Sequence, residues 1–304
     1  MSMLPNKKEI DNSYILSFFF RTYMKFKYLW TSDKKYAEKL FLRKFHKELD
    51  LENPKTFNEK IQWLKLNDRK EIHTICADKI AVRDFVSGVI GEKYLIPLEH
   101  VFISAKDLKP ENFANDYPII IKCNHNSGAY TIVRDKNNID WKKERLKYSN
   151  LLKQNYYHQG REWQYKNIEP KILVEKLLFD SKGNIPNDYK IFCFEGEAKF
   201  IQVDIDRQIN HLRNFYDTSW NLLPIELIYN KGDDVVKPKK IDLMLELAGK
   251  LSKNFPFARV DFYSLDDDIY FGEITFHPEA GFGVFNDEKY DVSLGNYLSL
   301  DKLK

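Results

Sequence analysis

Four polar residues near the end of the chain have a spacing that could bind a divalent cation: Arg259, Asp261, Glu273 and Thr275. They lie in two stretches of alternating polar and apolar residues around an acidic turn centred on Asp267, and this pattern predicts a β-hairpin. A turn centred there places Asp261 opposite Glu273 and Arg259 opposite Thr275. Because side chains alternate along a strand, all four share one face of the hairpin.

The two facing carboxylates admit two interpretations. Carboxylates directly across a strand pair repel each other, and a divalent cation between them would turn that repulsion into binding. Hard oxygen ligands in an open arrangement favour Mg²⁺ over zinc. In the other interpretation, Arg259 neutralises both acids on a polar sheet face and no metal binds. The opposite face is apolar and predicts a core layer, which consists of Val260, Phe262, Ile274 and Phe276.

A second candidate site follows a short apolar strand predicted at residues 119–121. Lys122 ends this strand, and a loop of small polar residues that includes Ser127 and Gly128 comes next. The lysine can bind phosphate oxygens while backbone N–H groups of the loop surround them. The alternative is a lysine that emerges from a strand end into water. The chain contains neither GxxxxGK(S/T) nor GxGxxG, which excludes the P-loop and the Rossmann dinucleotide site.

The elements that must position these residues can be assigned from sequence patterns. Thr56 with Glu59 three residues later forms a capping box, which predicts a helix to residue 66. Further helices are predicted at 75–89, 141–157 and 241–253. Strands are predicted at 119–121, 130–133 and 171–178, and hairpins at 189–203 and 257–276. Helices come first and mixed elements follow, so the predicted class is α+β.

Composition limits the class of protein. At about 150 residues per domain, 304 residues suggest two domains. Hydrophobic residues make up 43% and charged residues 31%, which is typical of a globular chain. The balance of 48 basic against 45 acidic residues does not indicate nucleic-acid binding. We expect no spanning helix and no signal peptide, and three separated cysteines without CxxC favour a reducing cytoplasm.

The first 50 residues differ from the rest in charge and aromatic content. They carry 11 Lys and Arg against 6 Asp and Glu, a net charge of +5, and seven aromatic residues lie between positions 18 and 30. A basic, aromatic helix can lie on an anionic membrane surface, which predicts peripheral membrane contact through residues 1–50. In the alternative, the aromatic side chains pack on the body of the protein and the lysines are solvated.

Several strings in combination resemble the TupA-like ATP-grasp family of bacterial surface-polysaccharide and teichuronopeptide gene clusters, over about residues 50–290. The matching strings are NPKTFNEKIQW from Asn53, ADKIAVR from Ala77, IKCNH from Ile121, REWQYK from Arg161, VEK from Val174, DYK from Asp188, and residues 257–283. The resemblance implies an ATP-grasp fold, in which two α+β subdomains sandwich ATP, with a helical N-terminal extension. We expect this extension at 1–52, a helical leading segment with Lys79 at 53–116, a nucleotide-binding subdomain at 117–180 and a C-terminal subdomain with the metal site at 181–304.

The resemblance also implies which residues bind the nucleotide. Lys79 and Lys122 resemble the two lysines that hold ATP phosphates, and Ser127 and Gly128 resemble the small-residue loop that closes over them. Further nucleotide contacts are implied at the adenine hinge and on the strand after it. These are Glu175, Lys176 and Leu178 at the hinge, with Asp188 and Lys190 on the strand.

For metal binding and catalysis, the resemblance implies residues of the last hairpin. Asp261 and Glu273 resemble the acids that hold Mg²⁺. Arg259 resembles the arginine that steadies the transferred phosphoryl group, a catalytic role that Lys122 shares. Thr275 stands where most ATP-grasp enzymes have asparagine, and its hydroxyl is expected to be a weaker metal ligand.

The implied activity is that of an ATP- and Mg²⁺-dependent carboxylate–amine ligase that works through an acyl phosphate. The family's gene setting implies that it joins an amino acid to a sugar of a capsule or O-antigen precursor, in the cytoplasm or at the inner face of the membrane. The expected partners are therefore an amino acid and a sugar or polysaccharide precursor, without nucleic acid. Two other functions stay open: a phosphotransferase acting on a sugar hydroxyl, and a non-catalytic polysaccharide-assembly protein.

Overall fold

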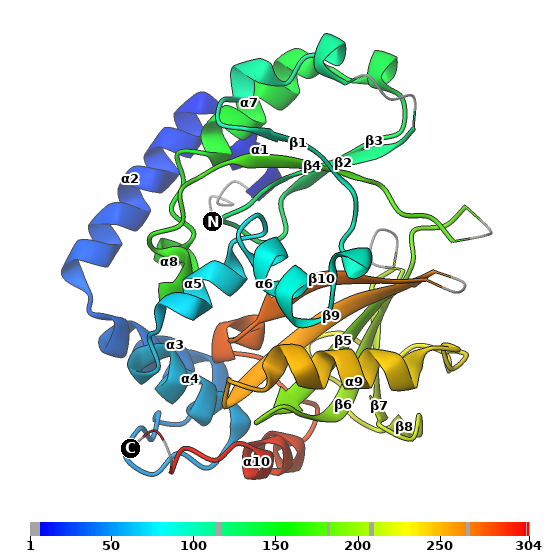
Figure 1. Cartoon of the computed structure of the whole chain (residues 1–304). Coiled ribbons are helices and arrows are strands. Elements are labelled where there is room, and N and C mark those ends of the chain that lie inside the picture. The colour runs from blue at the N-terminus through cyan, green and yellow to red at the C-terminus, as the bar shows by residue number, and fades with distance from the viewer. Residues whose placement is uncertain are drawn as a thin grey trace. The chain divides into compact units, whose positions relative to one another are not determined.

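Two units, each built from separate stretches of the chain, make up the computed structural model (Figure 1). The structure describes residues 7–113, 117–180, 183–206, 210–265, 268–301 and 303. Unit 1 consists of Met1–Ser32, Asp78–Ile80 and Ile96–Leu177, and unit 2 of Asp33–Ala77, Ala81–Leu95 and Leu178–Lys304. Each unit combines helices with an antiparallel sheet, which confirms the predicted α+β class.

Unit 1 contains a four-stranded sheet in the order β1-β4-β2-β3. The strands are β1 (Leu98–Phe102), β2 (Ile119–Cys123), β3 (Tyr130–Val133) and β4 (Ile172–Lys176). The helices are α1 (Lys7–Asp11), α2 (Tyr14–Trp30), α7 (Trp141–Leu151) and α8 (Tyr157–Gly160), with short 3₁₀ helices at Ala105–Asp107, Pro110–Asn112, Lys136–Asn138 and Trp163–Tyr165. Alternate residues of β2 and β4 pack on Tyr148 and Leu151 of α7 to form the core of this unit.

Unit 2 contains a six-stranded sheet in the order β10-β9-β5-β6-β7-β8. The strands are β5 (Asp188–Phe194), β6 (Glu197–Ile205), β7 (Leu212–Asp217), β8 (Leu222–Leu223), β9 (Phe257–Leu265) and β10 (Asp268–Thr275). The helices are α3 (Asp33–Phe45), α4 (Phe57–Asn67), α5 (Glu71–Ala77), α6 (Val82–Val89), α9 (Ile241–Ser252) and α10 (Glu288–Tyr297), with 3₁₀ helices at Glu92–Tyr94 and Pro278–Gly281.

The two faces of the unit 2 sheet have different coverings. One face is apolar and packs on α9 and α6; it contains Val260, Phe262, Ile274 and Phe276, which confirms the predicted core layer. On the other face, phenylalanines from β5, β6, β7 and β9 pack with α4 and α10 over one half of the sheet. Polar residues occupy the remaining half. The candidate catalytic side chains therefore lie beside a buried aromatic core.

The helix predicted from the capping box is confirmed as α4. The Thr56 hydroxyl accepts a hydrogen bond from the Glu59 backbone N–H at 3.2 Å, and the Glu59 carboxylate accepts one from the Thr56 N–H at 2.9 Å. These reciprocal bonds satisfy two backbone donors that would otherwise have no partner at the start of a helix.

The single helix predicted at 75–89 is wrong, because α5 ends at Ala77 and α6 begins at Val82. Asp78 accepts hydrogen bonds from the Ile80 N–H at 2.8 Å and from the Asn124 side chain at 3.0 Å. The Lys79 N–H donates to the Asn124 carbonyl at 3.2 Å. These bonds replace helical ones, and they hold residues 78–80 in unit 1 while both flanking helices belong to unit 2.

The helix predicted at 141–157 is also too long. α7 ends at Leu151, and a separate short helix, α8, begins at Tyr157. Between them, the Asn155 side chain accepts a hydrogen bond from the Tyr157 N–H at 3.1 Å and donates one to the Lys166 carbonyl at 2.9 Å. An asparagine that bonds to nearby backbone in this way competes with helix continuation.

The last hairpin has the predicted pairing at the candidate site, but its strand register nearer the turn differs from the predicted one. Glu273 pairs with Asp261 and Thr275 with Arg259, as predicted. Nearer the turn, however, Phe271 pairs with Phe262, one residue away from the Asp267-centred register. An irregularity between Phe271 and Glu273 restores the register, and Gly272 is the extra residue. The turn residues Asp266 and Asp267 themselves lie outside the described residues.

We predict that Gly272 is required for this correction of register. A Cβ at Gly272 would lie 3.1 Å from the Asp261 carbonyl oxygen, closer than a side chain normally approaches backbone. Gly272→Ala should therefore lower the free energy of unfolding by about 1 kcal/mol, measured by urea titration. The matched control is Gly88→Ala in α6, where a Cβ meets nothing within 4 Å. Equal unfolding free energies for the two variants would contradict the prediction.

Candidate functional site

The two predicted phosphate-binding lysines of unit 1 are organised by one loop. Lys122 lies on β2, and the loop follows directly after this strand. The Lys79 ammonium donates a hydrogen bond to the Asn126 carbonyl of that loop at 2.6 Å. Lys79 and Lys122 are 43 positions apart in the sequence, and this contact brings both to the end of β2.

Asn124 is the residue that fixes this loop. Its side-chain amide donates to Asp78 and to the Glu169 carbonyl, both at 3.0 Å, and its side-chain oxygen accepts from the Lys171 N–H at 2.7 Å. The side chain is fully buried. A buried amide with this many partners is strongly constrained, so the Lys79 segment, the loop and the approach to β4 form one rigid arrangement.

Ser127 and Gly128 lie at the tip of the same loop. Gly128 is exposed and has a φ of +82°, in the left-handed region that favours glycine. This conformation presents backbone to solvent without a side chain in the way. The geometry is compatible with the predicted contact between loop N–H groups and phosphate oxygens.

Glu175 lies on β4, on the sheet face opposite the α7 core. Its carboxylate accepts a hydrogen bond from Lys122 at 2.9 Å, which orients the lysine along the sheet. Lys176 is exposed, with its ammonium 5.5 Å from the centre of the Tyr117 ring. Leu178 is half-buried and is the first residue of the chain segment that belongs to unit 2.

In unit 2, Arg259 brings together all four hairpin residues singled out from the sequence. Its Nε and Nη2 donate to the two carboxylate oxygens of Asp261, each at 2.8 Å. Nη2 also reaches the Glu273 carboxylate and the Thr275 hydroxyl, both at 3.1 Å. Nη1 has no hydrogen bond within the described part of the chain, so this edge of the guanidinium is available to a ligand oxygen.

Lys190, the predicted nucleotide-facing lysine of β5, lies among carboxylates. Its ammonium is 2.7 Å from Asp261, 3.6 Å from Asp188 and 3.8 Å from Asp204. Burial lowers the pKa of Lys190, but these carboxylates more than compensate, and its pKa is raised above the ordinary value. The surrounding carboxylates therefore favour the charged form of this lysine.

Asp261 and Glu273 differ in how accessible they are. Asp261 is 3% exposed, and both its oxygens are engaged by Arg259 and Lys190. Burial raises the pKa of Asp261, against the opposing effect of the two cations. The Glu273 side chain is 33% exposed, and Thr275 donates to its carboxylate at 3.2 Å. Glu273 is therefore the more accessible oxygen donor.

These donors suit Mg²⁺ better than a metal that needs a cage of protein ligands. Among the described residues, no group of three or more His, Cys, Asp or Glu side chains could hold a metal ion. Mg²⁺ is typically bound by one or two carboxylates together with phosphate oxygens and water. Glu273, with Asp261 behind it and the Thr275 hydroxyl beside it, fits that pattern.

The polar half of the sheet extends beyond the residues identified from the sequence. Asp204 accepts a hydrogen bond from Arg213 at 2.7 Å and lies 3.4 Å from His211, and Arg213 reaches Glu279 at 3.1 Å. Asp206, Arg207 and His211 follow the predicted hairpin at 189–203, where the sequence admits either an anion-binding group or a solvated polar turn; Arg207 lies outside the described residues. Gln202 and Asp204 alternate with Ile201, Val203 and Ile205 in the sequence, and this alternation is the signal that would have identified Asp204.

Two histidines, His125 and His277, lie close in sequence to predicted site residues and could in principle act as bases for an incoming amine. His125 is buried, and its ring nitrogens lie 3.3 Å from the Asn124 side-chain oxygen and 3.2 Å from the Leu151 carbonyl. Burial lowers the pKa of His125 and lowers that of His277 further. The thiol of Cys123 is buried as well, and burial raises its pKa to about 12. These environments are typical of structural rather than reactive side chains.

Solved structures of ATP-grasp enzymes resemble this chain at low sequence identity. The ligase PsnB, in a complex with a precursor variant, Mg and ADP, is 8% identical with a TM-score of 0.42, over 67% of this chain and 51% of PsnB. D-alanine–D-alanine ligase from Bacillus anthracis, complexed with ATP, is 15% identical with a TM-score of 0.38, over 66% of this chain and 54% of the ligase. The enzyme from Helicobacter pylori is 13% identical with a TM-score of 0.43, over 80% and 67%.

The chain spans about half the length of PsnB. Comparison with curated protein sequences gives no match. A family model described as TupA-like ATP-grasp matches residues 59–299, which is most of the sequence and includes every predicted site residue. The chain therefore belongs to the TupA-like ATP-grasp family and has the ATP-grasp fold.

Proposed function

We propose that this protein is an ATP- and Mg²⁺-dependent ligase that joins a carboxylate to an amine. The observation that carries the proposal is the bidentate hydrogen bonding of Arg259 to Asp261, with Glu273 and Thr275 also bonded to the guanidinium, in a chain of an ATP-grasp family. Positive charge next to accessible oxygen donors suits a reaction in which negative charge moves between phosphate and carboxylate oxygens.

The proposed reaction has two steps. A carboxylate oxygen of the first substrate attacks the γ-phosphorus of ATP, which forms an acyl phosphate and releases ADP. The amine nitrogen of the second substrate then attacks the acyl carbon, the C–O bond to phosphate breaks, and the amine loses a proton to solvent. The products are an amide, ADP and inorganic phosphate.

The residues of each unit have distinct roles in this proposal. Lys79, Lys122 and the loop at Ser127 and Gly128 bind phosphate oxygens, and Glu175 keeps Lys122 oriented. Residues at the end of β4, Lys176 and Leu178, contact the adenine.

In unit 2, Glu273 is the principal Mg²⁺ ligand, with Asp261 and Thr275 in support. Bound there, the ion would neutralise charge on the phosphates. Nη1 of Arg259 stabilises the transferred phosphoryl group, and Asp188 and Lys190 face the nucleotide.

We further propose that the two substrates are an amino acid and a sugar of a capsule or O-antigen precursor, and that the reaction takes place in the cytoplasm. The resemblance to a family of surface-polysaccharide gene clusters supports this substrate class. ATP hydrolysis without a defined acceptor would not identify the reaction, so the test must capture the acyl intermediate.

Hydroxylamine trapping tests the reaction class. With ATP, Mg²⁺ and candidate uronic or amino acids, hydroxylamine in place of the amine should give a hydroxamate, with one ADP per product. A panel of carboxylates can be screened by the colour of the iron–hydroxamate complex. ADP together with a phosphorylated sugar, and no hydroxamate from any carboxylate, would favour a phosphotransferase instead.

Glu273→Gln tests the metal assignment. The substitution keeps the size of the side chain but removes the charge of the accessible donor, so ADP release at limiting Mg²⁺ should fall about a hundredfold. Thermal unfolding should stay close to that of the native chain, because Glu273 is partly exposed. The matched control is Glu246→Gln on α9, whose side chain is 58% exposed and pairs with Lys250. Native activity of Glu273→Gln at limiting Mg²⁺ would refute the assignment.

Arg259→Lys tests the catalytic role of the guanidinium. Lysine keeps the charge next to Asp261 but cannot form the fork and also present a further N–H group. The kcat should fall on the order of a hundredfold while KM for ATP changes only a few-fold, because the lost contact acts mainly in the transition state. If KM for ATP rises and kcat does not change, Arg259 acts in nucleotide binding and the catalytic role is wrong.

A further inference from the structure

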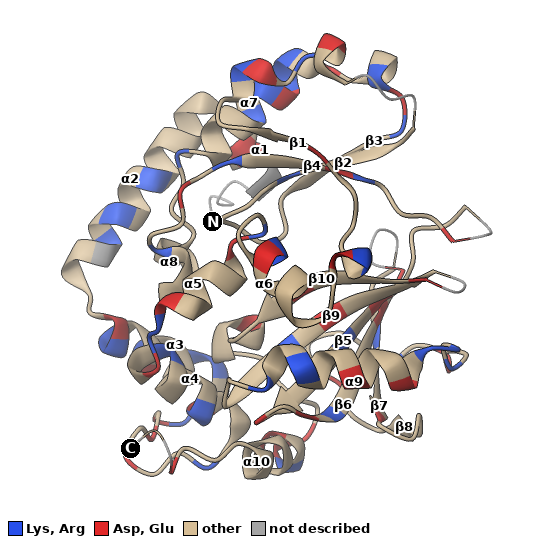
Figure 2. Ribbon diagram, in the orientation of Figure 1, with Lys and Arg blue, Asp and Glu red and all other residues tan. Residues whose placement is uncertain are grey.

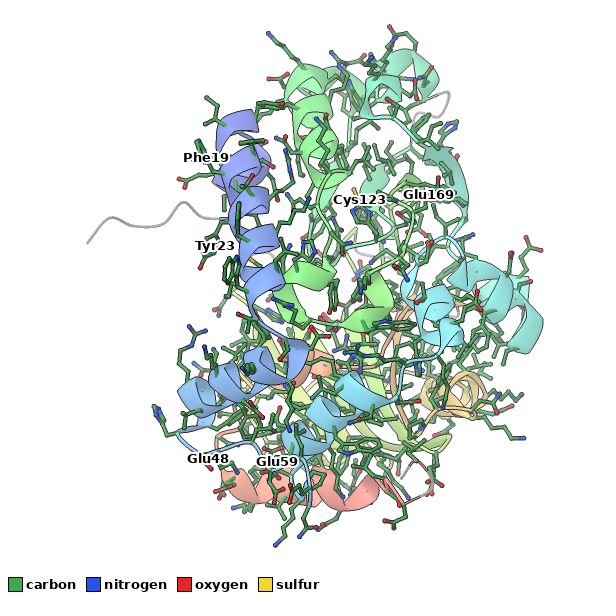
Figure 3. The ribbon with its side chains drawn as sticks, turned by 90° about the vertical axis from the view of Figure 1, so that its left-hand side faces the viewer. Phe19, Tyr23, Glu48, Glu59, Cys123 and Glu169 are labelled. Atoms are coloured by element: carbon green, nitrogen blue, oxygen red, sulfur yellow. The ribbon has the colours of Figure 1, made fainter. Side chains whose placement is uncertain are left out.

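Helix α2 exposes large apolar side chains on its outer side. Six of them are between 58% and 83% exposed and form what we call the apolar stripe: Ile15, Phe19, Tyr23, Phe26, Leu29 and Trp30. Apart from the final pair, successive members are three or four residues apart, which places them along one side of the helix. Figure 3 shows Phe19 and Tyr23 at the surface of α2. A continuous exposed stripe of this kind marks an interaction surface.

The inner side of α2 is held firmly in unit 1. Ser17 and Met24 are buried, and the helix packs against α1, α7 and α8. At its C-terminal end, the buried guanidinium of Arg161 donates to the Lys27 and Thr31 carbonyls, each at 3.3 Å. The apolar stripe is therefore presented by an anchored helix.

The charged residues of α2 are all basic. Arg21, Lys25 and Lys27 are its only charged side chains, and Figure 2 shows bands of Lys and Arg along the helix without Asp or Glu. On a helical projection Lys25 and Lys27 fall on opposite edges of the apolar stripe. An exposed apolar strip bordered by lysines has the chemistry of a helix that lies in the interface of an anionic bilayer.

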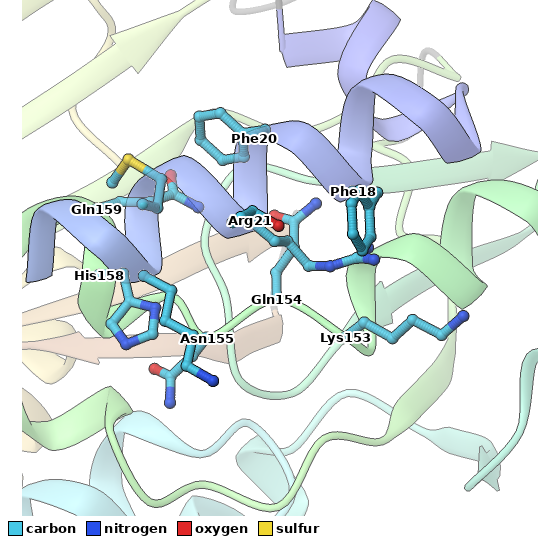
Figure 4. Close-up of a pocket in the computed structure, with 11 residues that line it drawn as sticks. Phe18, Phe20, Arg21, Lys153, Gln154, Asn155, His158 and Gln159 are labelled. Carbon is cyan, nitrogen blue, oxygen red and sulfur yellow. The ribbon is translucent and has the colours of Figure 1, made fainter. Parts of the chain in front are cut away.

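A pocket of about 250 Å³ opens between α2, α8 and the segment after α7 (Figure 4). Arg21, Lys25 and Lys153 line it, and the described lining residues include no acid. The pocket residue Gln154 donates a hydrogen bond to the buried Asp11 carboxylate at 2.9 Å. Burial lowers the pKa of His158 at the pocket, and Arg161, Lys25 and Lys166 lower it further. The pocket is therefore electropositive.

We propose that α2 docks this protein on an anionic membrane surface. The apolar stripe inserts at the boundary between headgroups and acyl chains, and the pocket at Arg21, Lys25 and Lys153 receives a lipid phosphate. Within the described residues, no helix is long and apolar enough to cross a membrane, which agrees with a helix that lies in the membrane plane. A second copy of the chain fits less well, because paired α2 helices would bring their cations together without acids on either helix. This proposal is independent of the ligase reaction.

Co-sedimentation of the full chain with vesicles tests the stripe. Vesicles with 30% phosphatidylglycerol should bind the protein, and the triple variant Phe19→Ser/Tyr23→Ser/Phe26→Ser should bind about tenfold less tightly or worse. The matched control is Ile103→Ser/Val236→Ser, which removes two apolar side chains of similar exposure outside the stripe and should bind normally. Thermal unfolding of the variants shows whether they are folded. An equal loss in both variants would overturn the proposal.

A second pair of variants tests the pocket. Lys25→Gln/Lys153→Gln should weaken binding to the same vesicles roughly tenfold to thirtyfold at low salt, with little effect on pure phosphatidylcholine. Lys34→Gln/Lys250→Gln removes two exposed lysines elsewhere and serves as the control. Equal affinity of the native chain for anionic and neutral vesicles would overturn the headgroup site. If the native chain does not bind vesicles but is a dimer in sedimentation equilibrium, and the triple variant is a monomer, the stripe is instead an interface with a second copy.

Discussion

The ion pair between Arg259 and Asp261 is the interaction on which the polar face of unit 2 depends. Two parallel hydrogen bonds of 2.8 Å join the guanidinium to both carboxylate oxygens, and both partners are buried. Removing either partner would leave the other buried charge with a single opposite charge, Lys190 for Asp261 or Glu273 for Arg259, and would therefore be destabilising. Lys190 and Glu273 contact the two members of this pair, so their positions follow from it. The sequence left open whether Arg259 neutralises the two acids or a metal joins them; the structure shows that Arg259 contacts both, and the proposed metal role rests on the accessible side of Glu273.

The aromatic half of the same sheet face explains how such a pair can be maintained. Phe192 is directly opposite Arg259 in the register of β5 and β9, and Phe257 precedes Arg259 by two positions on the same face. Both phenylalanines are fully or almost fully buried under α4 and α10. Water is excluded next to the ion pair, and charge–charge interactions are stronger where water is excluded. The packing of α4, which begins at the Thr56 capping box, therefore contributes to the electrostatics of the candidate site.

Local sequence patterns predicted the site hairpin better than they predicted its surroundings. Alternation placed Arg259, Asp261, Glu273 and Thr275 on one face correctly, but it could not reveal that a shorter turn and the bulge at Gly272 offset each other. Strand β7 escaped prediction because its interior contains the buried polar residues Arg213 and Asn214, which salt bridges and side-chain bonds satisfy. Two of these partners, Asp233 for Asn214 and Glu279 for Arg213, lie 19 and 66 positions away, so no short window of sequence contains them.

The break between α5 and α6 likewise depends on a hydrogen-bond partner that is distant in the sequence, and this break positions Lys79 of the candidate site. The apolar pattern at 75–89 continues across the break, and the competing partner, Asn124, lies 46 positions away from Asp78. Because Asn124 also fixes the loop after β2, the position of Lys79 relative to that loop is set within unit 1, although the helices on both sides of it belong to unit 2. Lys79 is thus bonded to the loop that follows β2, the strand that carries Lys122, while Lys122 itself is oriented by Glu175. Two cations bind the same phosphate group most effectively when both are positioned in advance. The role of Lys79 and Lys122 in nucleotide binding stays a prediction, but the hydrogen bonds that position their ammonium groups belong to the fold.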